Sequence, residues 1–195
     1  IVRATDGQVG EERVVEIVAN GSIQSSGSVT AKQINISSTA DIYVQGSYDN
    51  EGGNTLFESG HDLTIDGETN TMGDTTFEAV NEIHVNENVT TDSGNLSFLA
   101  DSDLDGEGAF LQASGTTIKT TTYGDVTLQS SGESTLANVV SAGDLILKGA
   151  GAPANYSVAS GSTITTQGSI RVDQSVTLNT VGAIHELPIQ FAVGG

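Results

Sequence analysis

The feature that most constrains the fold is a short sequence motif that recurs at intervals of about 20 residues or about twice that number. In each copy a small or acidic residue precedes an apolar residue, a third residue that is usually polar, and a second apolar residue. The copies are the segments 41–44 (DIYV), 62–65 (DLTI), 82–85 (EIHV), 125–128 (DVTL), 144–147 (DLIL) and 169–172 (SIRV). Alternation with a period of two predicts a short strand with its apolar side chains on one face.

Two columns of apolar residues keep the same period along the chain. One runs through Ile23, Ile42, Leu63, Ile83, Leu104, Val126, Leu145 and Ile164, and the other through Ile36, Phe57, Phe77, Phe98, Ile118, Leu136, Val158 and Leu178. A weaker third column passes through Val29, Val89 and Phe110. Residues that recur at one phase of every unit are typical of coils stacked along an axis, whereas antiparallel hairpins need no such period. The sequence therefore predicts an all-β fold, a right-handed parallel β-helix (β-solenoid) with coils of about 20 residues.

The two ends of the chain depart from the repeat. We expect about eight coils over residues 21–182. Residues 1–20 are predicted to form an N-terminal cap or docking strand, in which the stretch 10–19 favours a strand over a short helix. Residues 183–195 contain Pro188 and are predicted to form a C-terminal cap or linker. An open end of a β-helix is an unpaired sheet edge, so the ends are either capped, docked onto further coils or stacked on another copy.

Composition agrees with this fold and excludes several functions. The chain has 24 glycines for tight corners and only 2 prolines, because inner strands must donate every ladder hydrogen bond. Its 25 acidic and 6 basic residues give a formal charge of −19, which excludes unaided binding to nucleic acid and disfavours anionic membranes. Solubility accounts for such a charge, and a cation-binding surface is the alternative. No cysteine is present for thiol chemistry or Cys-ligated zinc, and no apolar run is long enough for a transmembrane segment.

Several phrases resemble the repeats of filamentous haemagglutinin-like exoproteins. They are Gly124-Asp125-Val126-Thr127-Leu128, Gly143-Asp144-Leu145-Ile146-Leu147 and the looser Gly60-His61-Asp62-Leu63-Thr64-Ile65. The resemblance covers about residues 20–180. It implies a long right-handed β-helical shaft that is exported to the cell surface and mediates adhesion or contact with other cells. This chain differs from that family in its strongly acidic charge and in lacking the family's secretion domain.

The sharpest local motif is the segment 101–108, which reads DSDLDGEG. Carboxylates on alternate residues (Asp101, Asp103 and Asp105), followed by a turning glycine and by Glu107, match the first half of a Ca²⁺-binding loop. An EF-hand would place a bidentate glutamate where the chain has Gln112, and its flanks would be helical, so this is not an EF-hand. The segment predicts an isolated Ca²⁺ site in a corner, with a solvated acidic turn as the alternative. Ca²⁺ is the one cofactor that the sequence indicates.

Other candidates carry less chemistry. The turn at residues 49–54 has fewer convergent carboxylates, and Asp74 and Asp92 lie in similar glycine-containing turns. The three histidines have no metal-ligand partner two or four positions away and are expected to face solvent: His61, His84 and His185. The six basic residues do not cluster as a polysaccharide lyase would require, and coils of this length leave little chain for the loops of a cleft. We therefore expect no enzymatic activity, with a carbohydrate-active β-helix enzyme as the alternative.

The predicted function is a structural shaft segment of a secreted or cell-surface filamentous protein or adhesin. One version of this hypothesis has the chain assemble into a fibre, and another makes that assembly depend on Ca²⁺. The expected partners are neighbouring coils or copies end to end and, from the resemblance, a glycan or the surface of a host or another cell. Nucleic acid is not an expected partner. The lack of cysteine fits an exported prokaryotic protein or a cytosolic one. The resemblance implies the exported protein, located outside the cell or on its surface.

Overall fold

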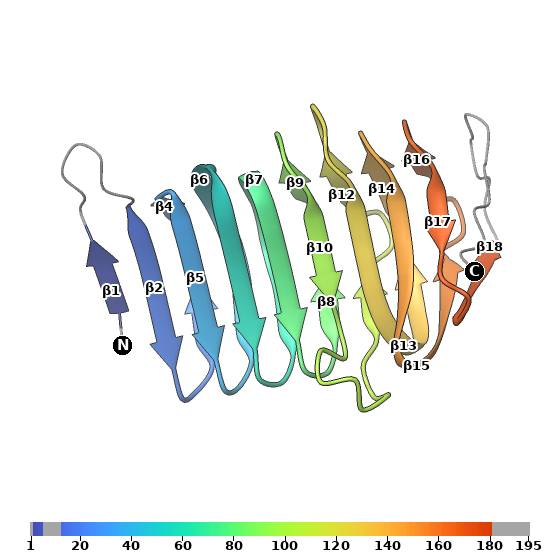
Figure 1. Cartoon of the computed structure of the whole chain (residues 1–195), viewed down its shortest axis with the longest axis horizontal. Helices are drawn as coiled ribbons and strands as arrows, with labels where there is room; N and C mark the ends of the chain where they lie inside the picture. Colours follow the sequence, from blue (N-terminus) through green and yellow to red (C-terminus); the bar gives the residue numbers. More distant parts are fainter. Residues whose placement is uncertain (1, 6–12, 181–195) are drawn as a thin grey trace.

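The computed structural model describes residues 2–5 and 13–180, and within these ranges every regular element is a β-strand. The strands wind around one axis, and each coil pairs in parallel with the coil before it and the coil after it (Figure 1). In Figure 1 the near strands run downward while the chain advances away from its N-terminus, and the far strands run upward. The coil is therefore right-handed, and the predicted parallel β-helix with short coils is confirmed.

Three parallel faces, which we call A, B and C, make up the wall of the solenoid. Face A contains β2 (Val14–Ala19), β5 (Gln33–Ser38), the ends of β6 (Ile42–Ser59) and β7 (Leu63–Ala79), β10 (Leu96–Leu99), the starts of β13 (Val126–Leu136) and β15 (Leu145–Val158), and β17 (Ile170–Val172). Face B contains β3 (Ile23–Ser25), the starts of β6 and β7, β8 (Ile83–Val85), β11 (Phe110–Gln112), the ends of β13 and β15, and β18 (Val176–Thr180). Face C contains β4 (Ser28–Thr30), the middles of β6 and β7, β9 (Val89–Thr91), β12 (Thr117–Thr120), β14 (Asn138–Ser141) and β16 (Ile164–Thr166).

The N-terminal end of face A is covered by a strand of opposite direction. Strand β1 (Val2–Thr5) pairs antiparallel with β2, and β2 in turn pairs in parallel with β5. The stretch for which the sequence favoured a strand over a helix is thus a strand from Val14 onward. The predicted C-terminal cap or linker at residues 183–195 lies outside the described residues.

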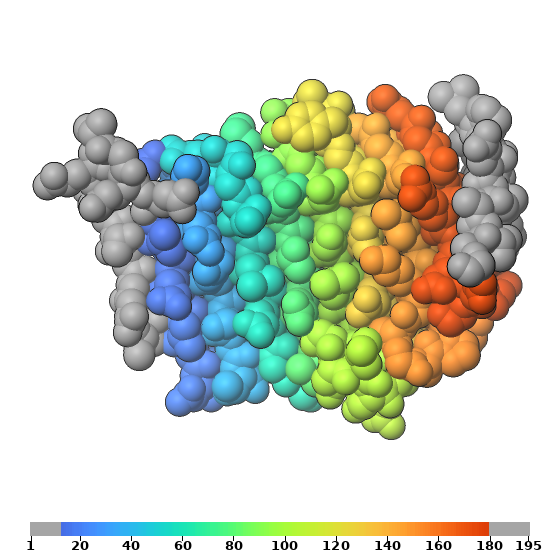
Figure 2. Space-filling model, viewed as in Figure 1, coloured from blue at the N-terminus to red at the C-terminus, as the bar shows by residue number. Residues whose placement is uncertain are grey.

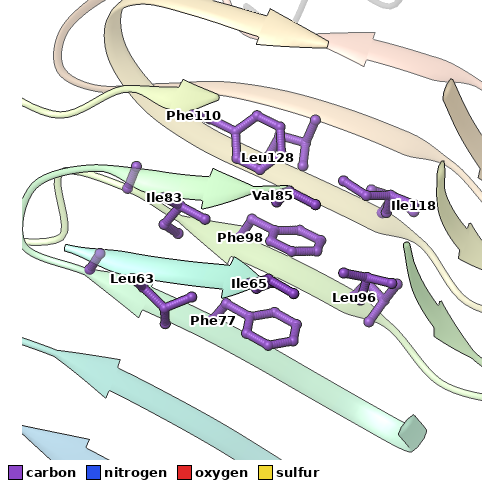
Figure 3. Close-up of a cluster of buried hydrophobic side chains, with 14 of the residues drawn as sticks. Leu63, Ile65, Phe77, Ile83, Val85, Leu96, Phe98, Phe110, Ile118 and Leu128 are labelled. Atoms are coloured by element: carbon purple, nitrogen blue, oxygen red, sulfur yellow. The ribbon is translucent and has the colours of Figure 1, made fainter. Parts of the chain in front are cut away.

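The first four members of each predicted column are confirmed by the register. Ile23, Ile42, Leu63 and Ile83 stack on face B, and Ile36, Phe57, Phe77 and Phe98 stack on face A. Parallel strands lie about 4.8 Å apart, so like side chains come into contact along the axis. Rings of Phe57, Phe77 and Phe98 are stacked with centroids 5.1 and 5.0 Å apart and planes 5° and 14° from parallel. Figure 3 shows Phe77 and Phe98 in this stack, which Tyr48 and Phe110 continue with edge contacts at 4.9 and 5.5 Å.

Beyond Phe98 both predicted columns are wrong, because one corner of the solenoid holds an insertion. Residues 100–109 join β10 to β11, whereas the corresponding corners of earlier coils have only residues 39–41, 60–62 and 80–82. Leu104 lies in this insertion and is 57% exposed, and Phe110 takes its place by pairing with Ile83. The extra residues move every later strand to a higher residue number than a fixed period predicts. Counting at that period therefore reaches strands of a different face after the insertion.

The later members of the predicted columns are distributed over all three faces. Val126 and Leu145 continue face A on top of Leu96, Ile118 and Ile164 lie on face C, and Leu136, Val158 and Leu178 lie on face B. The third predicted column is also wrong. Val29 and Val89 lie on face C but in different registers, and Phe110 belongs to face B. All these strands nevertheless bury apolar side chains in the core. The sequence therefore predicted the strands correctly, but it did not predict which strands stack on one another.

The corner between faces C and A is held by a ladder of side-chain acceptors. A side-chain oxygen in one coil accepts a hydrogen bond from the backbone N–H at the same place in the next coil. The links run from Asp74 to Asn95 (2.8 Å), Asn95 to Asp125 (2.8 Å), Asp125 to Asp144 (2.7 Å) and Asp144 to Ser169 (2.7 Å). The aspartates of the phrases GDVTL and GDLIL therefore have a structural role, since they satisfy backbone donors that the strands leave free.

Candidate functional site

Within the described residues, the insertion of residues 100–109 is the longest connection from face A to face B, and it carries the predicted Ca²⁺ motif. In Figure 2 it protrudes from the lower edge of the described coils, in the yellow-green part of the chain. Its base continues the pairing of the preceding coil, because the N–H groups of Asp101 and Ser102 donate to the carbonyl oxygens of Asn81 (3.1 Å) and Ala79 (3.0 Å). The insertion is thus anchored where it leaves the wall.

The far side of the insertion contacts the following coils. Gly108 and Ser131 exchange hydrogen bonds through the N–H of each residue, at 2.8 Å to the Ser131 hydroxyl and 2.7 Å to the Gly108 carbonyl. Gly151 packs so closely against the carbonyl of Leu104 that a Cβ at Gly151 would lie 2.3 Å from that oxygen. Contacts with coils on both sides hold the loop in a defined shape.

Within the insertion the backbone reverses direction. Asp101 and Leu104 have left-handed φ values of 55° and 62°, which non-glycine residues seldom adopt. The carboxylate of Asp101 accepts the N–H of Gly106 at 3.1 Å, and that of Asp105 accepts the N–H of Glu107 at 2.8 Å. These local bonds are typical of aspartate in turns. They hold the carboxylates of Asp101 and Asp105 against the backbone of the turn.

The structure brings Asp101, Asp103 and Asp105 together. One carboxylate oxygen of each lies within 4.8 Å of the others, with Asp101 fully buried and the other two exposed. Burial raises the pKa of Asp101, the Ser131 hydroxyl and the Gly106 N–H lower it, and the negative charge of Asp105 raises it again. Three oxygens around one point, with two open to solvent, form a partial shell of the hard ligands that Ca²⁺ prefers. Water and backbone carbonyls would have to supply the remaining ligands.

The fourth predicted ligand, Glu107, does not belong to this group of three carboxylates. It lines an open groove of about 530 Å³ between the insertion and face B, together with Asp62, Glu82 and Glu133. The two glycines that flank Glu107 and the small side chain of Ala109 leave this groove wide. Four of its lining residues are acidic and none is basic, so the groove carries a negative charge.

The weaker cation candidates have structural partners instead. In the turn at residues 49–54, Asn50 is fully buried and its amide donates to Thr55 and to the carbonyl of Asp74, both at 3.2 Å. Glu51 in the same turn forms an ion pair with Arg13. Asp74 belongs to the corner ladder described above. Among the residues that the structure describes, no group of three ligands forms at these positions or around Asp92.

The sequence did not reveal the surroundings of the histidines. His61 Nδ1 lies 2.8 Å from Asp41 Oδ1 and 3.2 Å from Asp62 Oδ2, and these three residues form the second group of potential metal ligands. His84 faces outward, as predicted, and its Nε2 lies 2.9 Å from Glu82 Oε2. A search at spacings of two and four residues misses Asp41, which lies one coil away from His61. The spacing of the repeat itself would have found it.

Comparison with known proteins adds no relative to this picture. No protein family, curated protein or solved structure matches the chain. In the described residues no helix has the length and apolar character needed to cross a membrane.

Proposed function

We propose that this chain is a structural segment of a filamentous protein, and that its coils stack end to end with further coils of the same protein or of another copy. The distribution of charge along the axis is the observation that carries the proposal. Residues 41–133 contain 18 acidic residues and one lysine, so they hold −17 of the formal charge of −19. Residues 1–40 and residues 134–195 each carry only −1.

The negative charge therefore lies on the middle coils of the rod, and the coils toward its two ends carry little net charge. Charged walls repel one another when two rods lie side by side, over a distance of about 10 Å at 0.1 M salt. The end coils carry little net charge and oppose stacking far less. The pattern therefore favours growth along the axis over lateral bundling, which is what a shaft requires.

Strand edges that no other described strand pairs with give this stacking a mechanism. Among the described residues, β3 and β4 at the N-terminal end pair only with β6, and β17 and β18 at the other end pair only with β15. Ile23 donates its N–H to Asp41 in the next coil (3.0 Å), so the N–H of Gln24 points toward the open end. Unpaired edges of this kind are templates for a further strand.

Electron microscopy and sedimentation of the isolated chain over a range of concentrations test the proposal. We expect rods that lengthen at constant width, and lateral bundles only at high salt, where screening shortens the repulsion to about 3 Å at 1 M. Gln24→Pro removes the N–H that points away from β6 and should reduce lengthening, while Gln24→Ala at the same position should not. Particles of one coil stack at every concentration would refute the proposal. Activity on a panel of polysaccharides would support the alternative function, a carbohydrate-active β-helix enzyme.

A specific observation also favours Ca²⁺ binding, namely the convergence of Asp101, Asp103 and Asp105 in a loop that contacts the coils on both sides. A site with few protein ligands resembles extracellular modules, which bind Ca²⁺ with Kd of about 10⁻⁴–10⁻³ M. Free Ca²⁺ at about ten times its Kd would stabilise the fold by about 1.4 kcal/mol.

Thermal unfolding in Ca²⁺ and in chelator measures this second function. We expect the Ca²⁺-dependent gain in Tm to disappear in the double variant Asp103→Asn/Asp105→Asn. The control variant Asp92→Asn, in another exposed glycine-containing turn, should keep the gain. An equal Tm of the unmodified chain in both solutions would exclude a Ca²⁺ site and a Ca²⁺-dependent filament. Assembly that ignores Ca²⁺ while Tm responds would exclude only the latter.

The remaining parts of the proposal depend on the resemblance described above. They are export to the cell surface in a prokaryote, membership of an adhesin related to filamentous haemagglutinin, and contact with a glycan or with the surface of a host or another cell. Binding of the labelled chain to cells and to a glycan array tests them. Absence of binding would leave a shaft without adhesive function.

A further inference from the structure

We propose that His61, Asp41 and Asp62 form a site for a borderline transition-metal ion such as Zn²⁺, separate from the Ca²⁺ loop. Asp62 directly precedes strand β7, and Asp41 directly precedes β6 in the previous coil. Stacking of the two coils therefore places both carboxylates at the same corner. His61 turns its ring into the space between them, so the site takes ligands from two successive coils.

The distances are close to those that a metal would impose. His61 Nδ1 is 2.8 Å from Asp41 Oδ1 and 3.2 Å from Asp62 Oδ2. Bonds of about 2.0–2.2 Å to one tetrahedral Zn²⁺ separate its ligand atoms by about 3.3–3.5 Å. All three ligand atoms lie within 4.8 Å of one another, so movement at the ends of the side chains would bring them toward these distances.

The corner is rigid where the metal would bind. The N–H of Ile42 donates to the carbonyl of Asp62 at 3.0 Å, which joins the two coils directly beside the ligands. The second oxygen of Asp62, Oδ1, accepts the N–H of Glu82 in the next coil at 3.2 Å. A carboxylate that is held through its other oxygen is oriented for binding, as outer-shell partners orient ligands in metal sites.

The chemistry of the ligands selects the class of metal. Both carboxylates only accept hydrogen bonds, so in the metal-free protein the Nδ1 that faces them carries a proton. A metal ion can bind Nδ1 only after this proton has left it, so the neutral ring loses the proton on Nδ1 and gains one on Nε2 through solvent. Imidazole suits Zn²⁺, Ni²⁺ and Cu²⁺, whereas Ca²⁺ prefers a shell of oxygens. The side chain of His61 is 57% exposed and those of both aspartates are 32% exposed, which leaves room for water to complete the shell.

Calorimetric titration of the unmodified chain and of single variants with Zn²⁺ tests the site. His61→Gln should raise the Kd for Zn²⁺ by about 10- to 100-fold, a range that loss of even an outer-shell partner can produce. His84→Gln is the matched control. His84 also contacts a carboxylate, that of Glu82, but it is not part of a group of three ligands. This variant should retain the Kd within about twofold, as expected for an independent site.

Two further measurements make the result decisive. Circular dichroism of each variant in chelator shows whether it remains folded, and NMR of the imidazole rings shows which histidine responds to Zn²⁺ first. We expect the ring of His61 to shift first, and excess Ca²⁺ to leave that shift unchanged. Equal affinity of His61→Gln and the unmodified chain, an earlier shift of His84 or His185, or displacement of Zn²⁺ by Ca²⁺ would each overturn the proposal.

Discussion

Replacement of Phe77 by leucine tests whether the aromatic stack stabilises the solenoid beyond simple burial. Phe77 is fully buried and its ring lies between two others, with nearly parallel planes and centroids 5.1 Å from Phe57 and 5.0 Å from Phe98. Phe110 is buried to the same extent but makes a single edge contact, at 5.5 Å and 65°. Phe110→Leu is therefore the matched control for Phe77→Leu.

The expected cost follows from these contacts. Each aromatic pair contributes about 0.5–1.5 kcal/mol beyond its burial, so Phe77→Leu loses about 1–3 kcal/mol from two pairs. A change of shape at similar volume adds up to about 1.5 kcal/mol. The total is about 1–4.5 kcal/mol for Phe77→Leu. Phe110→Leu, which loses one pair, should cost about 1 kcal/mol less.

Urea unfolding followed by far-UV circular dichroism measures the difference. With a slope of about 2 kcal/mol/M, a further loss of 1 kcal/mol moves the midpoint by about 0.5 M. The slopes of both variants must agree for the midpoints to be compared. If Phe77→Leu proves no more destabilising than Phe110→Leu, stacking of like rings adds nothing, and burial alone accounts for the column.

Three other substitutions address the corners and the outer wall. Asp125→Ala removes the acceptor for a backbone N–H in the next coil and should cost about 1–3 kcal/mol, whereas Asp125→Asn keeps an acceptor and should cost much less; urea midpoints compare them. Gly124→Ala should cost at least about 3 kcal/mol, because its Cβ would lie 1.8 Å from a carbonyl oxygen, while Gly115→Ala meets open space and should cost about 1 kcal/mol by the same measurement. Burial, together with the carboxylate of Glu58, raises the pKa of Glu78. Ionised Glu78 therefore disfavours the folded state, and Glu78→Gln should stabilise the protein by about 0.5 kcal/mol at neutral pH. That gain should disappear as the pH falls below the ordinary pKa of a glutamate, and a gain that persists in acid would contradict the reasoning.

Much of the fold could be predicted from the sequence, because the physical cause of the repeat is visible in it. Alternating apolar residues at one period specify strands, and stacking of strands specifies the columns of Ile42 and Phe57 in the first half of the rod. The period carries no information on the length of a particular corner. Once the corner after Phe98 takes in additional residues, counting assigns Leu104 to the core, although its backbone and exposure place it in a turn.

The candidate site could be predicted only in part, for a related reason. Asp101, Asp103 and Asp105 are close in sequence, so their convergence depends on one local turn, which the motif suggests. The partners of His61 and the ladder through Asp125 come from neighbouring coils. Their positions depend on the register between coils, which follows from the completed stack and not from any single segment.

The insertion has one more consequence, for how such a protein can diversify. Strand β10 before the insertion pairs with β7 and β13, and strand β11 after it pairs with β8 and β13, so both faces resume their pairing as if the corner were short. Chain length at this corner is thus uncoupled from the hydrogen bonding of the wall. Residues can be inserted at this corner without loss of the core. A repetitive scaffold can thus acquire an exposed loop whose sequence varies while the strands that carry it keep their pairing.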